Sequence, residues 1–366
     1  MAGLSVRRSS PTTRAATAGV VVLVVLLLSA AFWASDDVLR LMTDMFFYIA
    51  LACLWNFLAG YAGLVSVGQQ AYVGLGGYGL FALAAKAGLP ALYAVPLLGV
   101  AAALLSIPIA KLLFRLRGAY FAISSWVLAE VFHLAATLVV PLGAGSGMSL
   151  PVKAAQTLGR TPHDRFVATY LSVFALLLAI LAMIFVVLRS RMGLALTAIR
   201  DNEGAARSSG VNVDQVKLII YVAAACGTAM VGALIFLQRL RISPDSGFSV
   251  NDWTALVIFM VVIGGIGTFE GPIIGALVYF FLRETLANLG PLYLIILGAV
   301  AIAVMLIEPQ GIWGFVRSRW GLQLLPLSFF VSRSQNQGGP SEMHSCRRSI
   351  RHRRDRGGVE QGPGGA

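Results

Sequence analysis

The amino-acid sequence predicts an all-α protein, a polytopic transmembrane helical bundle of about ten spans (8–10). Three observations lead to this prediction. The 366 residues are 58% hydrophobic and only 12% charged, whereas soluble domains are about 45–50% apolar and about 25% charged. The mean hydropathy is +0.80. Apolar runs close to the ~20 residues that a helix needs to cross a bilayer recur along the chain.

The candidate spans begin at residue 17 and end at residue 308. The first follows Arg7, Arg8 and Arg14 as a signal peptide would, but no convincing cleavage site follows its apolar run, so we expect a retained anchor. The third and ninth are rich in glycine and are the least regular. The ten segments are 17–35, 39–60, 64–85, 90–112, 118–140, 166–188, 216–238, 252–270, 272–289 and 291–308.

The placement of Lys and Arg predicts which loops face the cytoplasm, where these residues are in excess. With the N-terminus inside, the cytoplasmic parts before residue 317 hold eleven Lys and Arg, against eight outside. An even number of spans returns the chain to the same side, so we expect the N- and C-termini to be cytoplasmic. Residues 1–16 then form a cytoplasmic segment, and residues 17–316 form the transmembrane domain in a multi-pass chain.

Residues 317–366 are predicted to be a basic, disordered cytoplasmic tail. Nine arginines and three acidic residues give this tail half of the chain's net charge of +12. The stretch from Arg347 to Arg356 is rich in arginine, and the Gly-rich sequence that follows it has no apolar periodicity, as in disordered segments. A contact with anionic lipid or nucleic acid is one interpretation, and a solvated tail without a specific ligand is the simpler one. We expect the lipid bilayer as surroundings and no nucleic-acid partner.

The motifs of common enzymes and metal sites are missing from the sequence. It contains no GxxxxGK[ST] phosphate loop, no HExxH and no GxSxG. The four histidines do not cluster, and the three cysteines lie far apart without a CxxC pair. The sequence therefore predicts a protein that is not an enzyme, has no catalytic or metal-binding residues, and binds no cofactor itself.

Residues 189–215 form a polar loop on the predicted cytoplasmic side. Residues 194–209 are compatible with a helix, and Gly210 is placed to end it. Asn202 is placed to cap a short second turn, with Glu203 near its positive N-terminal end. Leu196, Ile199 and Ala206 are expected to offer a modest apolar surface to a partner.

The same loop has a simpler interpretation, as a solvated helix that only connects two spans. In that case Asp201 and Glu203 pair with Arg200 and Arg207, and each pair contributes a few tenths of a kcal/mol. Composition alone leaves both interpretations open.

Glycines mark two further segments, residues 60–79 and 264–276. Glycine permits close helix packing in a membrane. It also permits a broken helix, which is tolerated only inside protein or beside a water-filled cavity. Ser66, Gly68 and Gln69 are therefore candidates for lining a substrate pathway, and tight packing alone is the alternative. Glu270 and Pro272 indicate a break between two short helices.

Glu130 lies near the middle of the span 118–140, where an unpaired carboxylate is costly and a functional role is the default. A proton relay with His133 one turn later would make the protein a secondary transporter. A carboxylate hydrogen-bonded inside the bundle is the competing interpretation. Ser124 and Glu130 complete the candidate pathway residues.

Four stretches together resemble the M-type permease of the high-affinity branched-chain amino-acid importer family, which belongs to the ABC importers. They are AIRDNEGAARSSGVNVDQVKL from Ala198, GYAGLVSVGQQAYVGLGGYG from Gly60, LRGAYFAISSWVLAEV from Leu116 and GGIGTFEGPIIGA from Gly264. Their order and spacing fit over about residues 36–315. One departure is Glu308-Pro309-Gln310-Gly311, where the family often has a basic residue before the Pro-x-Gly turn.

The resemblance implies the transmembrane permease subunit of an importer in the bacterial cytoplasmic (inner) membrane. A second permease subunit, two ATP-binding subunits and a periplasmic substrate-binding protein would be its partners, with ATP bound by those partners. Residues 189–215 would be the coupling loop to the ATPase. The implied contacts lie at Ala198, Arg200, Asp201, Asn202, Glu203, Ala206 and Gly210.

Leucine, isoleucine and valine are the implied substrates. Urea or short-chain amides are an alternative, because similar permeases carry them. A proton-coupled secondary transporter that uses Glu130 is the alternative from another class.

Overall fold

Two units of the chain are distinguished in the structure, a computed structural model. It describes residues 4–7, 11–86, 88–151, 158–159, 161–286, 292–308, 310–320 and 330–333. The larger unit is Thr13–Leu327, and the smaller joins Met1–Thr12 with Ser328–Ala366. In the smaller unit, β1 (Leu4–Arg7) pairs antiparallel with β4 (Phe330–Arg333). Most of the predicted disordered tail, residues 321–329 and 334–366, lies outside the described residues, as do residues 1–3 and 8–10 of the predicted N-terminal segment.

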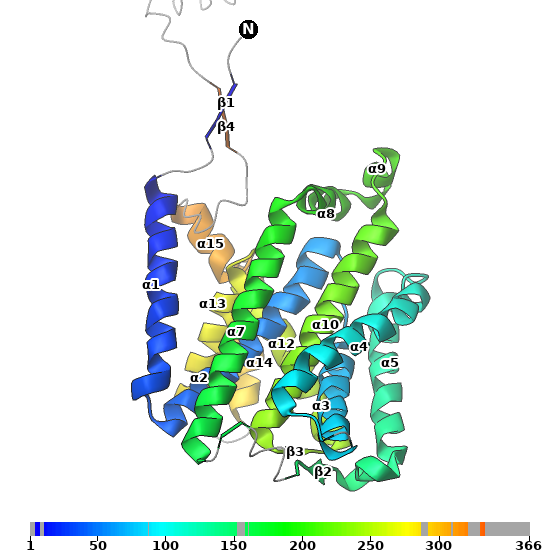
Figure 1. Cartoon of the computed structure of the whole chain (residues 1–366). Helices are drawn as coiled ribbons and strands as arrows, with labels where there is room; N and C mark the ends of the chain where they lie inside the picture. Colours follow the sequence, from blue (N-terminus) through cyan, green and yellow to red (C-terminus); the bar gives the residue numbers. More distant parts are fainter. Residues whose placement is uncertain are drawn as a thin grey trace, which may run out of the picture. The chain divides into compact units, whose positions relative to one another are not determined.

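The larger unit is a helical bundle, which confirms the predicted fold class (Figure 1). Each of the ten predicted segments coincides with a helix or with consecutive helices. The longer helices are α1 (Pro11–Trp33), α2 (Asp36–Asn56), α3 (Gln69–Lys86), α4 (Ala91–Leu113), α5 (Ala119–Leu138), α7 (Pro162–Arg189), α10 (Val213–Arg239), α13 (Gly271–Leu286) and α14 (Leu292–Ile307).

Short elements connect these helices. A π-helical turn, η1 (Phe57–Tyr61), extends α2, and a second one, η4 (Asn251–Ala255), leads into α12 (Leu256–Gly264). The strands β2 (Met148–Ser149) and β3 (Arg241–Ile242) pair antiparallel. The other short elements are η2 (Val140–Leu142), η3 (Ala144–Ser146), α8 (Arg191–Asp201), α9 (Glu203–Ser208), α11 (Pro244–Gly247) and α15 (Gly311–Trp320).

Seven helical stretches among the described residues are long and apolar enough to cross a membrane. The predicted spans that do not reach this threshold are α1, whose described apolar part is Gly19–Trp33, the Gly-rich α3, and α13 with 16 residues. The seven are Asp36–Tyr61, Ala91–Leu113, Ala119–Leu138, Pro162–Arg189, Val213–Arg239, Pro244–Gly264 and Ile295–Val316. The chain is therefore a multi-pass membrane protein by length and composition.

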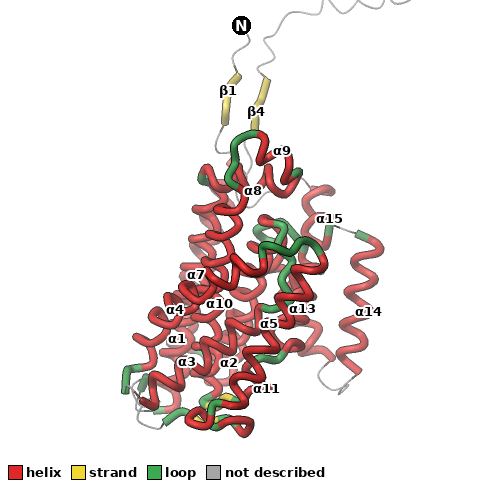
Figure 2. Tube along the Cα trace, turned by 90° about the vertical axis from the view of Figure 1, so that its right-hand side faces the viewer, coloured by secondary structure: helices red, strands yellow, loops and turns green. Residues whose placement is uncertain are grey.

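Helix α10 is the centre of the bundle, because it contacts α2, α3, α4 and α7. Large side chains fill the core around it, among them Trp55, Trp253 and Tyr170. The helices α5 and α14 are the least covered, with only 17% and 12% of their apolar windows buried in this chain. Figure 2 shows α14 at the margin of the bundle. These two helices present apolar surface for lipid or another protein to cover.

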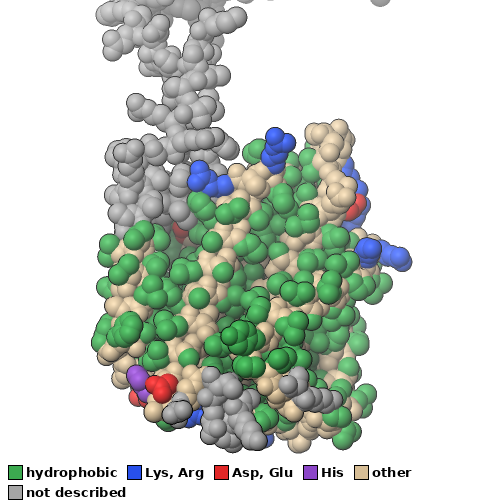
Figure 3. Space-filling model, viewed as in Figure 1, with side chains coloured by type: hydrophobic (Ala, Val, Ile, Leu, Met, Phe, Trp, Pro, Cys, Tyr) green, Lys and Arg blue, Asp and Glu red, His purple; other side chains and the backbone are tan. Residues whose placement is uncertain are grey.

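The visible face of the bundle is mainly hydrophobic, as a surface in contact with lipid requires (Figure 3). Most of the Lys and Arg side chains visible there lie at the end that carries α8 and α9, and acidic and histidine side chains gather at the opposite end. This distribution agrees with the positive-inside argument. The cytoplasmic location of the α8–α9 end and of both termini stays a prediction.

Helices α3 and α10 pack with their backbones in close contact. A β-carbon at Gly76 would lie 2.0 Å from the Ala229 carbonyl oxygen, and one at Gly232 would lie 2.3 Å from the Val73 carbonyl oxygen. No side chain fits at either point. The tight-packing interpretation of the Gly-rich segment is therefore correct for its helical part.

The broken-helix interpretation is correct for the preceding residues, 63–68, which are not helical. Several of their polar groups are paired within the protein. The Val67 amide donates to Ser125 Oγ at 2.9 Å, and Trp55 Nε1 donates to the Ser66 carbonyl at 2.7 Å. These bonds let irregular backbone lie between helices inside a membrane, where no water replaces a missing partner.

Candidate functional site

The segment formed by α8 and α9, residues 191–210, lies at one end of the bundle (Figure 1). Helix α8 ends at Asp201, and Asn202 then adopts an extended conformation. Its Oδ1 accepts a hydrogen bond from the Ala205 amide at 3.0 Å, which caps α9. The predicted cap and second turn are confirmed, and the segment 194–209 forms two helices that are interrupted at Asn202.

Gly210 ends α9 with a φ of +85°, a conformation that favours glycine. The Gly210 amide donates to the Arg207 carbonyl at 3.0 Å, and the Val211 amide donates to the Ala206 carbonyl at 3.1 Å. These two bonds form a Schellman motif, which satisfies the last carbonyls of the helix. The predicted stop at Gly210 is confirmed.

The predicted apolar docking surface of this segment is wrong. Leu196, Ile199 and Ala206 are all buried within the chain itself. Ile199 and Ala206 pack with Val213 at the start of α10, and α8 also contacts η1. Helical spacing places apolar residues on one side but does not say what covers that side. The large apolar side chain that this segment exposes is Leu194, which is 63% exposed.

Ion pairs hold α9 to the beginning of α10, as the alternative interpretation of the loop anticipates for Glu203 and Arg207. Glu203 accepts from Lys217 Nζ at 2.7 Å and from Arg207 Nη2 at 3.2 Å. Arg207 also donates to both oxygens of Asp214, at 2.8 and 3.2 Å. The hydrogen bond from Lys217 is the main cause that lowers the pKa of Glu203 below its ordinary value of 4.5. Glu203 therefore stays ionised at neutral pH.

The ion pair predicted between Arg200 and Asp201 is also present, at 3.7 Å. Arg200 makes a second contact outside its own helix. Its Nη1 lies 3.3 Å from the point where Gly267 would carry a β-carbon, so the guanidinium packs against the loop between α12 and α13. This loop is the break predicted from Glu270 and Pro272, and α13 begins at Gly271.

Asn56, the last residue of α2, holds the same loop. It is 2% exposed, its Nδ2 donates to the Thr268 carbonyl at 2.8 Å, and its Oδ1 accepts from the Gly267 amide at 2.8 Å. The sequence analysis missed this residue. An amide side chain within an apolar run was the available signal, since such a group needs a partner in a membrane. The α8–α9 segment, η1 and the α12–α13 loop thus meet around Arg200 and Asn56.

Replacing Asn56 by leucine is expected to loosen this junction. The change leaves the amide of Gly267 and the carbonyl of Thr268, both half-buried, without their partner, and each costs up to about 1–3 kcal/mol. We expect a lower melting temperature and faster amide exchange at Gly267. Hydrogen-exchange mass spectrometry of the purified chain measures the amide exchange rates of the α12–α13 loop and, for comparison, of distant helices. Unchanged exchange over residues 264–271 would contradict the assignment, and Asn251→Leu, at an exposed position, serves as the control.

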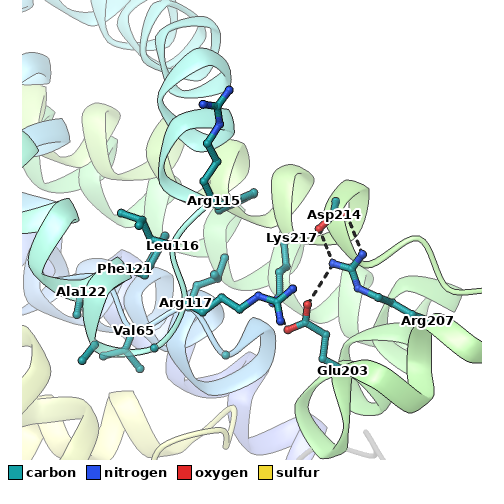
Figure 4. A pocket seen from close by; sticks show the side chains of 15 residues that line it. Val65, Arg115, Leu116, Arg117, Phe121, Ala122, Glu203, Arg207, Asp214 and Lys217 are labelled. Atoms are coloured by element: carbon teal, nitrogen blue, oxygen red, sulfur yellow. Dashed lines mark hydrogen bonds and ion pairs between the residues drawn. The ribbon is translucent and has the colours of Figure 1, made fainter.

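A cavity of about 650 Å³ adjoins the α8–α9 segment (Figure 4). The ion-paired side chains of α9 and α10 form one wall, and the connection between α4 and α5 forms another. Figure 4 shows Arg117 extending toward the ion pairs and Arg115 lying farther along the connection. The lining residues are Gly63, Leu64, Val65, Phe114, Arg115, Leu116, Arg117, Gly118, Ala119, Phe121, Ala122, Glu203, Arg207, Asp214 and Lys217. Within the described part of the chain, no group of His, Cys, Asp or Glu is suited to hold a metal ion.

Three of the five candidate pathway residues lie together in the interior. Ser66 and Gln69 are buried, and a β-carbon at Gly68 would lie 2.1 Å from the Ser125 carbonyl oxygen. Gln69 Nε2 donates to the Leu51 carbonyl and to Thr228 Oγ1, both at 3.2 Å, while Gln69 Oε1 is buried without a hydrogen-bond partner. These residues are packed between helices in this structure, and their role in a pathway stays a prediction.

The other two candidates, Ser124 and Glu130, lie on α5. Ser124 is half-buried, and Glu130 is 48% exposed at the surface of this chain. Glu130 Oε1 pairs with His133 Nδ1 at 3.0 Å, and His133 Nε2 lies 3.2 Å from Asp245. The expected histidine partner is thus confirmed, but the expected position inside the bundle is wrong. The reason is that α5 packs on few neighbours and leaves this face uncovered.

The comparison with protein families identifies the chain. Residues 38–305 match the family described as the branched-chain amino acid transport system / permease component. This chain belongs to that family. The match covers most of the chain, from the first turn of α2 to the last turn of α14. It therefore confirms the resemblance seen in the four sequence motifs.

Individual relatives agree with the family. The high-affinity branched-chain amino acid transport system permease protein LivM of Escherichia coli (strain K12) is 26% identical over 316 residues, 80% of this chain and 73% of LivM. The high-affinity branched-chain amino acid transport system permease protein LivH of the same strain is 33% identical over 142 residues, 37% of this chain and 44% of LivH. The ribose import permease protein RbsC is 34% identical over 106 residues, 28% of this chain and 32% of RbsC. No solved structure is significantly similar to this chain.

Proposed function

We propose that this permease-family chain is one permease subunit of an ABC importer for leucine, isoleucine and valine in the bacterial inner membrane. The observation that carries the proposal is the similarity to LivM across most of both chains, within a family match over residues 38–305. The similarity to LivH supports a second, related permease as the partner with which this chain forms the translocation pathway.

In this proposal, separate ATP-binding subunits drive transport through the α8–α9 segment, and a periplasmic binding protein delivers the substrate. The exposed side chains of Leu194, Ala198, Asp201 and Asn202 are available to a docked ATPase. Glu203, Ala206 and Gly210 keep α9 in place through ion pairs, packing and the helix stop. ATP is bound by the partner subunits, and this chain needs no cofactor of its own.

The contact between Arg200 and Gly267 gives the docked segment a route into the bundle. A displacement of α8 presses on the α12–α13 loop, and Asn56 links that loop to α2. Beyond α2 and η1 lies the non-helical segment 63–68, next to Gln69. The conformational change of the ATPase would therefore pass from α8 to the α12–α13 loop, and from there through α2 and η1. It would then reach Ser66, Gly68 and Gln69.

The uncovered face of α5 suits the border of a pathway shared with a second permease. It carries Ser124 and Glu130 among apolar side chains such as Ile123 and Val127. A pathway for apolar amino acids needs a few polar groups and little fixed charge. In this proposal the second permease covers the α5 face and closes the pathway.

Uptake of radiolabelled leucine tests the proposal. The chain is co-expressed with candidate genes for a second permease, the ATPase subunits and a binding protein from the same organism, in a host without leucine importers. We expect uptake that needs this chain and ATP, and that isoleucine and valine suppress but urea and ribose do not. Preferential uptake of urea would replace the substrate assignment. Uptake that survives ATP depletion, but stops with a protonophore and in Glu130→Gln, would indicate the proton-coupled alternative.

A further inference from the structure

The cavity beside α9 carries positive charge that no neighbouring group neutralises. Of its four basic side chains, Arg207 and Lys217 are paired with Glu203 and Asp214. Arg115 and Arg117 also line the cavity, and neither has an ion-pair partner among the described residues. Glu203 and Asp214 are thus both in ion pairs, and the remaining charge in the lining is the positive charge of Arg115 and Arg117. The excess of basic side chains in the lining favours an anion over a zwitterion as the ligand.

The backbone at the same place also favours an anion. Helix α5 begins directly after Arg117, with Gly118 at its N-cap. No side chain caps its first amides, and no acidic residue lies in its first turn. The positive end of a 20-residue helix therefore adds to the two free guanidinium groups.

The position of the cavity distinguishes a lipid from a soluble phosphate. Residues 114–118 connect two helices of membrane-spanning length, α4 and α5, so this connection lies at the level of the lipid headgroups. Apolar side chains next to it are exposed, among them Leu112, Leu116, Tyr120 and Ile123. Tyrosine at such a boundary is typical of contact with headgroups. An acyl chain beside the exposed Leu112 at the end of α4 would cover surface that this chain leaves bare.

We propose that the cavity between the α4–α5 connection and α9 binds the phosphate of an anionic phospholipid through Arg115 and Arg117. The lipid then lies beside the ion pairs that fix α9, so the composition of the membrane bears on the segment that connects this subunit to its ATPase. The first part of this proposal does not depend on the transported substrate.

Lipid binding to the purified full-length chain tests the proposal. Short-chain phosphatidylglycerol, short-chain phosphatidylcholine and inorganic phosphate are titrated against the wild type and Arg115→Gln/Arg117→Gln in detergent. A basic residue at a membrane surface contributes about fivefold in affinity, so the double variant is expected to lose about 25-fold for phosphatidylglycerol. Arg191→Gln, an exposed arginine at the same end without a described ion pair, is the matched control and should bind as the wild type does.

Three results would overturn the proposal. Equal affinity for phosphatidylglycerol in the wild type and the double glutamine variant would show that Arg115 and Arg117 do not bind the lipid. Binding of inorganic phosphate as strong as that of phosphatidylglycerol excludes the lipid as the preferred ligand. Loss of ATPase co-purification with unchanged lipid affinity assigns the cavity to a protein partner. Arg115→Lys/Arg117→Lys separates charge from folding, because it should retain most of the binding if the site is electrostatic.

Discussion

Replacing Gly76 by leucine is expected to prevent stable assembly of the bundle. A leucine β-carbon would lie 2.0 Å from the Ala229 carbonyl oxygen, so α3 and α10 would have to separate. Overpacking costs about 1–3 kcal/mol when side chains can yield, and more when they cannot. Here the obstacle is backbone in the central helix, so we expect a cost of about 3 kcal/mol or more. The measurement is the melting temperature and the yield of monodisperse protein in detergent.

Gly298→Leu is the matched control for this experiment. Gly298 lies in α14, another apolar helix, and an added β-carbon there meets no atom within 4 Å. Its effect should stay within about 0.5 kcal/mol, as for most surface substitutions. Equal melting temperatures of the two variants would show that α3 and α10 do not pack as the structure describes.

The double substitution Glu203→Leu/Gly210→Leu is expected to abolish uptake while the chain still inserts and folds. Leucine at position 203 removes the partner of Lys217 and one of the two partners of Arg207. Leucine at position 210 has to adopt a φ of +85°, which costs about 1–2 kcal/mol. Both changes weaken the attachment of α9 to α10 without touching the core of the bundle, and the Arg207–Asp214 pair remains. ATP-dependent leucine uptake in cells and the melting temperature of the purified variant separate the two effects.

Glu284→Leu/Gly298→Leu provides the control with the same residue types. Both residues are exposed, and they lie in α13 and α14, away from the α8–α9 segment. This control should transport normally. Normal transport by the Glu203→Leu/Gly210→Leu variant would instead show that α9 has no part in coupling.

The fold was predictable because its main signal is local. An apolar run of sufficient length becomes a helix in a bilayer wherever it occurs, since only a helix satisfies its own backbone there. The two ends of α9 were equally predictable, because Asn202 and Gly210 form hydrogen bonds with residues within a few positions of themselves. These are the predictions that needed no knowledge of the rest of the chain.

The errors concern surfaces, which depend on distant residues. Leu196 and Ile199 share a side of α8, but only the position of η1 and α10 makes that side internal. Glu130 lies in the middle of a span, but only the few neighbours of α5 leave it at the surface. Asn56 could not be assigned a partner, because Gly267 follows 211 residues later. Arg115 and Arg117 could not be identified as unpaired from the sequence, because the ion pairs of Glu203 with Lys217 and of Asp214 with Arg207 depend on the fold.

The non-helical residues 63–68 constrain how the ribosome and the insertion machinery build this protein. The Val67 amide finds its acceptor on Ser125, which is synthesised 58 residues later, and the Gln69 amide group finds Thr228 159 residues later. Until α5 emerges, this stretch has no partner for that amide other than water. We therefore expect the nascent α3 to wait in the aqueous translocon or at the membrane surface, and to enter the lipid together with α5. The order of synthesis is then not the order of insertion.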